Sequence, residues 1–291
     1  NVENFFDHID QGTGESDKEF SSMGTRRWTR KKFQAKCDNI AKSLLWMGES
    51  YGRMPDVVGF AELENRGVLR KLLESTLLRK YDYEIVHHDS GDRRGIDVGL
   101  IYRRSSFNLV SHSVTVPEYE GEKLATRDLL QVCLKDFKGE DIHFIVNHHP
   151  SKYGGEKESD GRRNAAMMAL KHVCDSLAEV SGHPVIAMGD FNDTPDGPAF
   201  SLIEDILVNK GMDLHQGGSG TIRYEGKWEL IDNFLVSPDI VAEMHICQIP
   251  FLMTWERKHP GEKPLRTYSG PRYIGGVSDH CPIILWYFKG N

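Results

Sequence analysis

The sequence predicts a mixed α/β fold, because short apolar runs typical of strands alternate with longer segments of helical spacing. No Pro/Gly/Ser-rich linker and no repeat of fixed period divides the chain. Charged residues make up 27% of the sequence and hydrophobic residues 39%, which is the balance of an ordinary globular domain rather than a disordered one. We therefore expect a single domain over residues 1–291.

The first half of the chain contains the clearest helix signal. Thr29 is a suitable N-cap, and apolar residues recur after it at helical spacing, from Phe33 to Leu45. Residues 1–6 predict a short strand, which is followed by a loop through Gly24. Further elements are predicted as a helix at 67–78 and strands at 57–60, 83–87, 98–102, 129–134 and 143–147.

The second half continues the alternation of strands and helices. Helical spacing predicts helices at 162–177 and 199–207, and a glycine-rich loop occupies 217–220. Apolar runs predict strands at 185–188, 230–236 and 283–288, and the segment 249–253 is interpreted as a core strand.

Charge and cysteine content narrow the function classes. Lysine and arginine number 36 against 43 aspartate and glutamate residues, so the net charge of −7 argues against sequence-independent coating of DNA. An acidic enzyme can still bind an anionic substrate, because a bound cation reverses the local charge. The five cysteines form no C-x-x-C pair, so neither a zinc site nor a redox pair is indicated.

Polar residues stand where several predicted strands end or begin. These residues are Glu62, His148, Asp190, Asn192 and the pair Asp279-His280. Carboxylate and amide oxygens are the ligands preferred by hard cations such as Mg²⁺, Mn²⁺ or Ca²⁺. A site for such a cation is therefore expected at one rim of the sheet.

Six segments, in their order and spacing, resemble the endonuclease/exonuclease/phosphatase superfamily. The superfamily includes deoxyribonucleases, abasic-site endonucleases, neutral sphingomyelinases and inositol polyphosphate phosphatases. The segments are Asn1-Val2-Glu3-Asn4, residues 55–62, Asn147-His148, residues 189–192, Ile231-Asp232-Asn233 and Ser278-Asp279-His280. The resemblance implies a deoxyribonuclease-like four-layer sandwich, in which two mainly antiparallel β-sheets are flanked by α-helices.

The resemblance also implies a metal shell. Asn1, Glu62 and Asp279 are expected to bind the catalytic Mg²⁺ (or Mn²⁺ or Ca²⁺), with Glu62 as the main carboxylate ligand. Glu64 offers a second carboxylate, but Glu62 fits the family register better. Ala61 stands where the family often has glutamine.

A second group of residues is expected to face the phosphate. The resemblance implies that Asp190 orients or deprotonates the attacking water and that Asn192 holds a nonbridging oxygen. His148 and His280 are expected to contact the phosphate, and Asp232 to hydrogen-bond His280 and favour its charged form. These five residues are the predicted catalytic set.

Basic residues near this rim are candidates for substrate binding. Arg94, Arg127 and Lys152 are predicted to hold substrate phosphate, and the arginines are preferred because the guanidinium group binds phosphate in a bidentate manner. The basic run that contains Trp28 is interpreted as a solvated helix face. His87 and His88 are interpreted as structural.

These observations predict a divalent-metal-dependent phosphoester hydrolase, above all a nuclease-like phosphodiesterase. The alternatives are a phosphatase or phospholipase-type hydrolase of inositol phosphate, sphingomyelin or another small phosphoester, and a non-catalytic binding module on the same fold. The expected partner is a phosphoester substrate, nucleic acid included, with no stable protein partner and a monomeric state. Because the chain begins at Asn1 without methionine, we expect that an upstream segment was removed, and a secreted or periplasmic location is favoured over a cytoplasmic one.

Overall fold

The computed structural model describes residues 1–12, 14–151 and 156–288 of the protein. Its largest element is a six-stranded sheet in the order β10-β13-β9-β8-β7-β4. The strands of this sheet are β4 (Phe107–Thr115), β7 (Leu129–Asp136), β8 (Asp141–His148), β9 (Val185–Asp190), β10 (Val208–Asn209) and β13 (Asp232–Val236). Neighbours pair antiparallel except β8 and β9, which are parallel.

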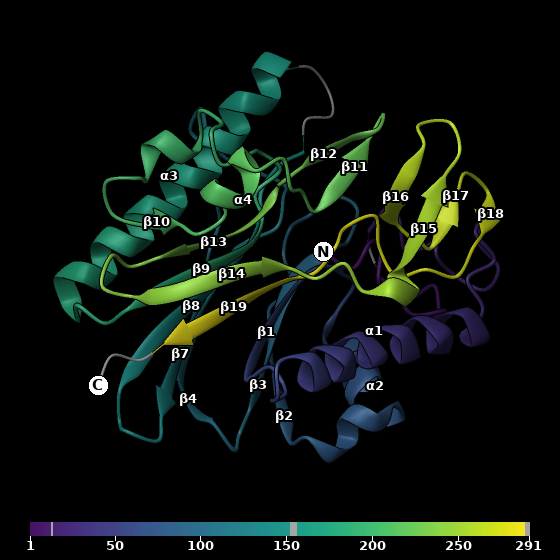
Figure 1. Cartoon of the computed structure of the whole chain (residues 1–291), viewed down its shortest axis with the longest axis horizontal. Coiled ribbons are helices and arrows are strands. Elements are labelled where there is room, and N and C mark those ends of the chain that lie inside the picture. The colour runs from purple at the N-terminus through teal and green to yellow at the C-terminus, as the bar shows by residue number, and fades with distance from the viewer. Residues whose placement is uncertain (13, 152–155, 289–291) are drawn as a thin grey trace.

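A second layer of strands packs against the first (Figure 1). It contains the three-stranded sheet β1-β3-β2 and the separate pair β14-β19. Their bounds are β1 (Val57–Leu63), β2 (Tyr83–His87), β3 (Asp97–Arg103), β14 (Val241–Ile246) and β19 (Ile283–Phe288). One apolar core joins the two layers, because side chains from both meet in a single cluster around Leu100 and Val146.

Helices cover the outer faces of both sheets. The helix α1 (Arg30–Ser50) and the helix α2 (Arg66–Ser75) pack on the β1-β3-β2 side, whereas α3 (Glu156–Val180) packs on the six-stranded sheet. The short elements are α4 (Met212–Gln216) and the 3₁₀ turns η1 (Leu77–Lys80), η2 (Phe200–Leu202) and η3 (Pro250–Leu252). The predicted four-layer α/β sandwich is therefore confirmed.

Four two-stranded hairpins complete the fold. They are β5-β6 (Glu118–Tyr119 and Glu122–Lys123), β11-β12 (Ile222–Tyr224 and Lys227–Glu229), β15-β16 (Met253–Glu256 and Gly261–Pro264) and β17-β18 (Tyr268–Ser269 and Arg272–Tyr273). In Figure 1 the last three project beyond the end of the sheets where the N-terminus lies. Among the described residues, no helix combines the length and apolar character needed to cross a membrane.

Most predicted elements are present, and the exceptions have physical reasons. Thr29 caps α1 by accepting from the Lys32 N–H, as expected. The helix predicted at 199–207 is wrong: Phe200 and Ile203 are buried at helical spacing, but the backbone there forms mainly i→i+3 bonds. The strand expected at 1–6 is reduced to one parallel bridge between Phe5 and Leu63.

Two further differences concern strands. β4 was not predicted because its side chains are mostly exposed and therefore form no apolar run. The segment 249–253, expected as a core strand, is instead the 3₁₀ turn η3 leading into β15. Pro250 starts that turn, because its fixed φ and missing N–H suit the first position of a helical turn.

Gly189 allows β8 and β9 to lie close together at the end of the sheet. Its φ is 138°, and a Cβ there would stand 1.9 Å from the Asn147 carbonyl oxygen. We expect Gly189→Ala to lower the free energy of unfolding by more than the roughly 1–3 kcal/mol of backbone strain alone, because the clash is with backbone. Urea unfolding measures this change.

Gly139 provides the matched control for that measurement. Its φ is 87°, but a Cβ there would meet nothing within 4 Å. Gly139→Ala therefore carries the strain without the clash. Equal destabilisation by the two variants would contradict the close approach at Gly189.

Candidate active site

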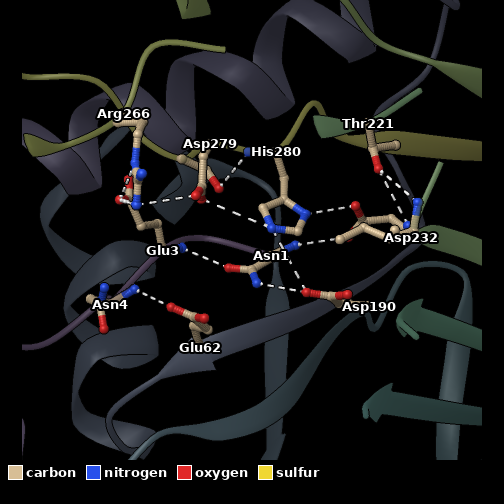
Figure 2. Close-up of polar contacts among 12 residues, drawn as sticks. Asn1, Glu3, Asn4, Glu62, Asp190, Thr221, Asp232, Arg266, Asp279 and His280 are labelled. Atoms are coloured by element: carbon tan, nitrogen blue, oxygen red, sulfur yellow. Dashed lines mark hydrogen bonds and ion pairs between the residues drawn. The ribbon is translucent and has the colours of Figure 1, made fainter. Parts of the chain in front are cut away.

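The paired strands bring the predicted residues together at one edge of the six-stranded sheet. In the parallel β8–β9 pair, His148 stands opposite Asp190, and in the antiparallel β9–β13 pair, Asp232 stands opposite Asp190. Asp190 is thus the middle of three adjacent strand ends. Figure 2 shows Asn1 and His280 reaching the same carboxylate from other parts of the chain.

Asp190 is almost completely buried, and its two oxygens have different partners. Oδ1 accepts from the Asn192 N–H at 2.9 Å, and Oδ2 accepts from Asn1 Nδ2 at 2.9 Å. Oδ2 also lies 3.6 Å from His148 Nε2 and 3.8 Å from His280 Nε2. Burial raises the pKa of Asp190 to about 6, against the opposing effect of His280.

Asp232 and His280 form a short buried contact. Asp232 Oδ2 lies 2.7 Å from His280 Nδ1, and the Asp232 N–H donates to Thr221 Oγ1 at 3.3 Å. Burial alone lowers the pKa of His280, but Asp232 and then Asp190 outweigh it and raise that pKa to about 9. The imidazole is therefore a cation at neutral pH, with Nε2 directed toward Asp190.

Glu62 reaches the site because β1 bulges at this residue. The β1–β3 register shifts between Ala61 and Leu63, and Glu62 has a φ of 66°, which is uncommon for a residue other than glycine. Its Oε2 accepts from the Asn4 N–H at 2.8 Å and lies 3.4 Å from Arg94 Nη2. Burial raises the pKa of Glu62, but Arg94 and the Asn4 N–H outweigh this effect and the net pKa is lowered.

Glu64 has a different environment from Glu62. Its Oε2 accepts from the Asp7 N–H at 2.7 Å, away from the Asp190 cluster. Burial, together with the nearby Asp7 and Asp17 carboxylates, raises its pKa to about 8. Glu64 is thus neutral at pH 7, whereas Glu62 carries the charge that a metal ligand needs.

A network that the sequence did not predict links the first residues of the chain to Asp279. Glu3 accepts from Arg266 Nε and from the Thr267 N–H, each at 2.9 Å, while Arg266 Nη2 lies 3.1 Å from Asp279 Oδ2. The Glu3 N–H in turn donates to Asn1 Oδ1 at 2.8 Å. The guanidinium group therefore positions Asp279 relative to Asn1 (Figure 2).

Lys36, a residue of α1, bonds both Glu3 and Thr267. The side chain is buried in α1, and its Nζ donates to the Glu3 carbonyl and, at 2.9 Å, to Thr267 Oγ1. Burial lowers the pKa of Lys36 to about 8, although Glu3, Glu62 and Asp279 all act to raise it. The carboxylates of Glu3, Glu62 and Asp279 are thus close enough to the buried Lys36 ammonium group to stabilise its charge.

The three predicted metal ligands have the chemistry that a hard divalent cation prefers. Asn1, Glu62 and Asp279 supply an amide and two carboxylates, which are the oxygen donors that Mg²⁺ and Mn²⁺ prefer. A second arrangement, Asp190 with Asp232 and His280, places one possible ligand atom of each residue within 4.8 Å of the others. In its cationic form the His280 ring carries a proton on both nitrogens and has no lone pair for a metal.

The remaining predicted residues lie at or near this edge. His148 is buried and burial holds its pKa well below the usual range, so the imidazole is neutral. Asn192 donates from Nδ2 to the His149 carbonyl at 2.9 Å and has a φ of 51°. Its amide keeps a second N–H for a substrate oxygen.

The predicted substrate-binding residues differ in their exposure and in their contacts with other side chains. Arg94 is 42% exposed, although it bonds Asn4 Oδ1 at 2.6 Å. Arg127 is buried and contacts Asp92 at 3.2 Å and the His149 carbonyl at 2.7 Å, which gives it a structural role at the base of the rim. Lys152 lies outside the described residues. His87 was interpreted as structural, and its Nε2 lies 3.0 Å from Asp97 Oδ2.

One family model matches almost the whole chain. The family model described as "Endonuclease/Exonuclease/phosphatase family" matches residues 1–289. The chain belongs to this family. Members of the Endonuclease/Exonuclease/phosphatase family are typically phosphoester hydrolases that depend on a divalent metal.

Solved structures show the same fold at low sequence identity. A mannosyl-6-phosphatase from Bacteroides thetaiotaomicron is 15% identical with a TM-score of 0.61, over 89% of this chain and 92% of that chain. The human Nocturnin catalytic domain is 16% identical with a TM-score of 0.57, over 87% of both chains. Truncated TDP2 of Caenorhabditis elegans is 15% identical with a TM-score of 0.59, over 88% of this chain and 91% of that chain. No curated protein matches the sequence.

The difference between Glu62 and Glu64 can be tested by metal binding. We expect Glu62→Gln to weaken Mn²⁺ binding at least about 100-fold, because a charged ligand contributes more than the outer partners whose loss costs about 10–100-fold. Glu64→Gln is the matched control, since its neutral carboxyl group is replaced by an amide of the same shape. Calorimetric titration with Mn²⁺ measures both. Equal losses in the two variants would contradict the assignment.

Proposed function

We propose that this protein is a Mg²⁺- or Mn²⁺-dependent phosphoester hydrolase with nuclease-like phosphodiesterase activity. The observation that carries the proposal is the Asp190 carboxylate, which lies within 3.8 Å of the cationic His280 ring and 2.9 Å from the Asn1 amide. A buried base beside a fixed cation is the arrangement needed for attack of water on a phosphate. The membership of the family supports the same reaction class.

The residues of the chain divide the chemical work between them. Asp190 takes a proton from the attacking water, a role that contributes typically about 10²–10⁴-fold in rate. His280, held by Asp232 through Nδ1, places a positive charge where the phosphate oxygens become more negative. A cation held by Asn1, Glu62 and Asp279 would neutralise charge on the phosphate when bound.

Two exposed aromatic side chains favour nucleic acid as the substrate. Tyr224 on β11 is 66% exposed and Trp255 on β15 is 64% exposed. The two hairpins are in contact and are anchored at the site, because Thr221 precedes β11 and Arg266 follows β16. Exposed aromatic faces on hairpins that are anchored at the site are suited to stack the bases of a single strand.

The reaction class is tested with bis-p-nitrophenyl phosphate in the presence of Mn²⁺. We expect Asp190→Asn and His280→Ala each to lower kcat/KM at least about 100-fold, because each removes a group that acts on the reacting phosphate. His112→Ala, an exposed histidine on β4, is the control and is expected to keep the rate. Unchanged turnover in the Asp190 and His280 variants would overturn the proposed site.

The substrate class is tested separately. Stacking contributes roughly 1–3 kcal/mol per base, so we expect the double variant Tyr224→Ala/Trp255→Ala to raise KM for a single-stranded oligonucleotide about tenfold or more. Its rate on bis-p-nitrophenyl phosphate should not change, because that substrate has no run of bases to stack on the two rings. Phe137→Ala is the control, since Phe137 is 67% exposed in the β7–β8 turn at the opposite end of β8. An unchanged oligonucleotide KM would favour a small phosphoester substrate.

The pH dependence follows from the two titrating groups. Asp190 must be unprotonated to act as a base, so kcat/KM should rise as the pH passes about 6. His280 must stay protonated, so kcat/KM should fall above about 9. In Asp232→Asn the upper limb should move to lower pH, because Asp232 is the strongest of the groups that raise the His280 pKa. An upper limb that stays in place would contradict the role of Asp232.

A further inference from the structure

A pocket of about 250 Å³ lies next to the segments that build the candidate site. Its lining combines side chains from the start of the chain, from the loop before α1 and from the segment that joins β16 to β18. The lining includes Glu3, Asn4, Phe20, Arg26, Arg266 and Tyr268. We call it the basic pocket, because it contains two guanidinium groups.

Arg26 is fixed in the basic pocket by several contacts. Its Nε donates to Glu19 Oε1 and its Nη1 donates to the Gly270 carbonyl, each at 2.6 Å. The guanidinium group also lies over the Tyr268 ring, 5.2 Å from the ring centroid. Within the part of the chain that the structure describes, Arg26 Nη2 makes no hydrogen bond. A guanidinium group held in this way loses little freedom when a ligand binds, which favours affinity.

Arg266 brings a second guanidinium group to the basic pocket. Its Nε donates to Glu3 Oε1 at 2.9 Å, and its Nη2 lies 3.1 Å from Asp279 Oδ2. Among the described residues, Arg266 Nη1 makes no hydrogen bond, and half of the side chain is exposed. Two guanidinium groups that each keep a free nitrogen are suited to a phosphate group, because its oxygens accept several hydrogen bonds at once.

The acidic groups at the basic pocket already have donors. Both oxygens of Glu3 accept hydrogen bonds, one of them from Arg266, and Glu19 accepts from Arg26. The buried Lys36 Nζ adds a positive charge next to Glu3, because it donates to the Glu3 carbonyl. A bound anion would therefore meet carboxylates whose charge is compensated by neighbouring cations.

The sequence around Arg26 is basic although the protein as a whole is acidic. Residues 20–37 contain six lysines and arginines and no aspartate or glutamate, whereas the net charge of the chain is −7. Arg26 departs from the interpretation of this run as a solvated helix face, because it precedes α1 and lines the pocket. A local positive field of this kind concentrates anionic ligands.

One carboxylate links the basic pocket to the phosphate side of the candidate site. Asp279 Oδ2 is the contact of Arg266, and Asp279 Oδ1 lies 3.9 Å from His280 Nε2. Figure 2 shows Arg266 on one side of Asp279 and His280 on the other. A phosphate group in the basic pocket would therefore be a neighbour of the phosphate that His280 contacts, and not the same group.

We propose that the basic pocket binds a second phosphate group of the substrate, the next one along the strand from the phosphate that reacts. Arg26 and Arg266 bind its oxygens through their free nitrogens. The inference rests on the proposed function, because Asp190 and His280 act on the first phosphate. It makes the preferred substrate a strand of nucleotides rather than an ester with a single phosphate.

An inositol bisphosphate also carries two phosphate groups, so its chemistry is shared with that of a nucleotide strand. The strand is favoured, because the exposed rings of Tyr224 and Trp255 lie on hairpins anchored at the same site and are suited to stack its bases. The experiment therefore compares both kinds of bisphosphate.

The proposal is tested by calorimetric titration of the 291-residue chain in EDTA, which prevents metal-dependent turnover. The probes are thymidine 3′,5′-bisphosphate, thymidine 5′-monophosphate and inositol 1,4-bisphosphate. We expect the thymidine bisphosphate to bind at least about tenfold more tightly than the monophosphate, because only the bisphosphate can engage His280 and the basic pocket together.

Three variants locate the source of that preference. Arg26→Gln should lower it at least about fivefold while the affinity for the monophosphate stays within about twofold, and Arg26→Lys should keep part of it because lysine retains the charge without the planar fork. Arg104→Gln is the matched control, since Arg104 also bonds a carboxylate, that of Asp82 at 2.6 Å, but lies in the turn between β3 and β4. Thermal unfolding of each variant checks that it is folded.

Equal binding of the two thymidine nucleotides by the unaltered chain would overturn the proposal. So would a preference that Arg26→Gln keeps, or one that Arg104→Gln loses to the same extent, because the field of the whole protein would then be its cause. Tighter, Arg26-dependent binding of the inositol bisphosphate would assign the pocket to a small phosphoester instead of a strand.

Failure of the proposed function gives a different result. If bis-p-nitrophenyl phosphate is not hydrolysed but the Arg26-dependent preference for the thymidine bisphosphate is present, the reaction class is wrong and the assignment of the basic pocket is supported.

Discussion

The buried contact between Asp232 and His280 is the interaction on which the charges of the site depend. Burial alone would leave the imidazole neutral, and a carboxylate at 2.7 Å reverses that preference. Removing one partner from such a pair leaves an uncompensated buried charge, which costs far more than an exposed ion pair contributes. Burial raises the pKa of Asp190 to about 6, and the cation opposes a larger rise, which keeps that carboxylate available as a base near neutral pH.

Pairing between strands supplies the precision that this electrostatic arrangement requires. A shift of one residue between β9 and β13 would turn Asp232 to the other face of the sheet and away from His280. Several residues of the site also hold left-handed backbone, with φ between 42° and 66°: Glu3, Asn4, Glu62 and Asn192. Strain of this kind persists only where surrounding contacts over-determine it, and it is common at functional sites.

The strand ends of the site could be predicted from the sequence, because an apolar run followed directly by a carboxylate or imidazole marks the rim of a sheet. The order of these segments along the chain resembles that of the family, and this resemblance predicted the hydrogen bond between Asp232 and His280. The choice of Glu62 over Glu64 rested on register, and the bulge at Glu62 explains why a residue of β1 points to the rim. The helix expected at 199–207 failed because apolar spacing reports which side chains are buried, and not which carbonyl each N–H reaches.

Contacts between distant segments could not be predicted in this way. Glu3 and Arg266 are 263 positions apart, and no local pattern indicates that a guanidinium group near one end of the chain holds a carboxylate near the other. The same is true of Lys36, which looks like one lysine in a solvated helix face yet is buried beneath Glu3. Such contacts arise only after the sheets have packed.

The first residues of the chain take part in both the site and the sheet. Asn1 donates to Asp190 and accepts from Glu3, while the Val2 N–H donates to the Ala61 carbonyl at the edge of β1. Order at that edge therefore restricts the position of a proposed metal ligand. Because Asp190 and Glu3 hold Asn1 in the folded chain, part of its conformational entropy is lost in folding rather than in binding, so less of it opposes the binding of cation and substrate. The stability of the sheet and the affinity of the site are then coupled through a single residue.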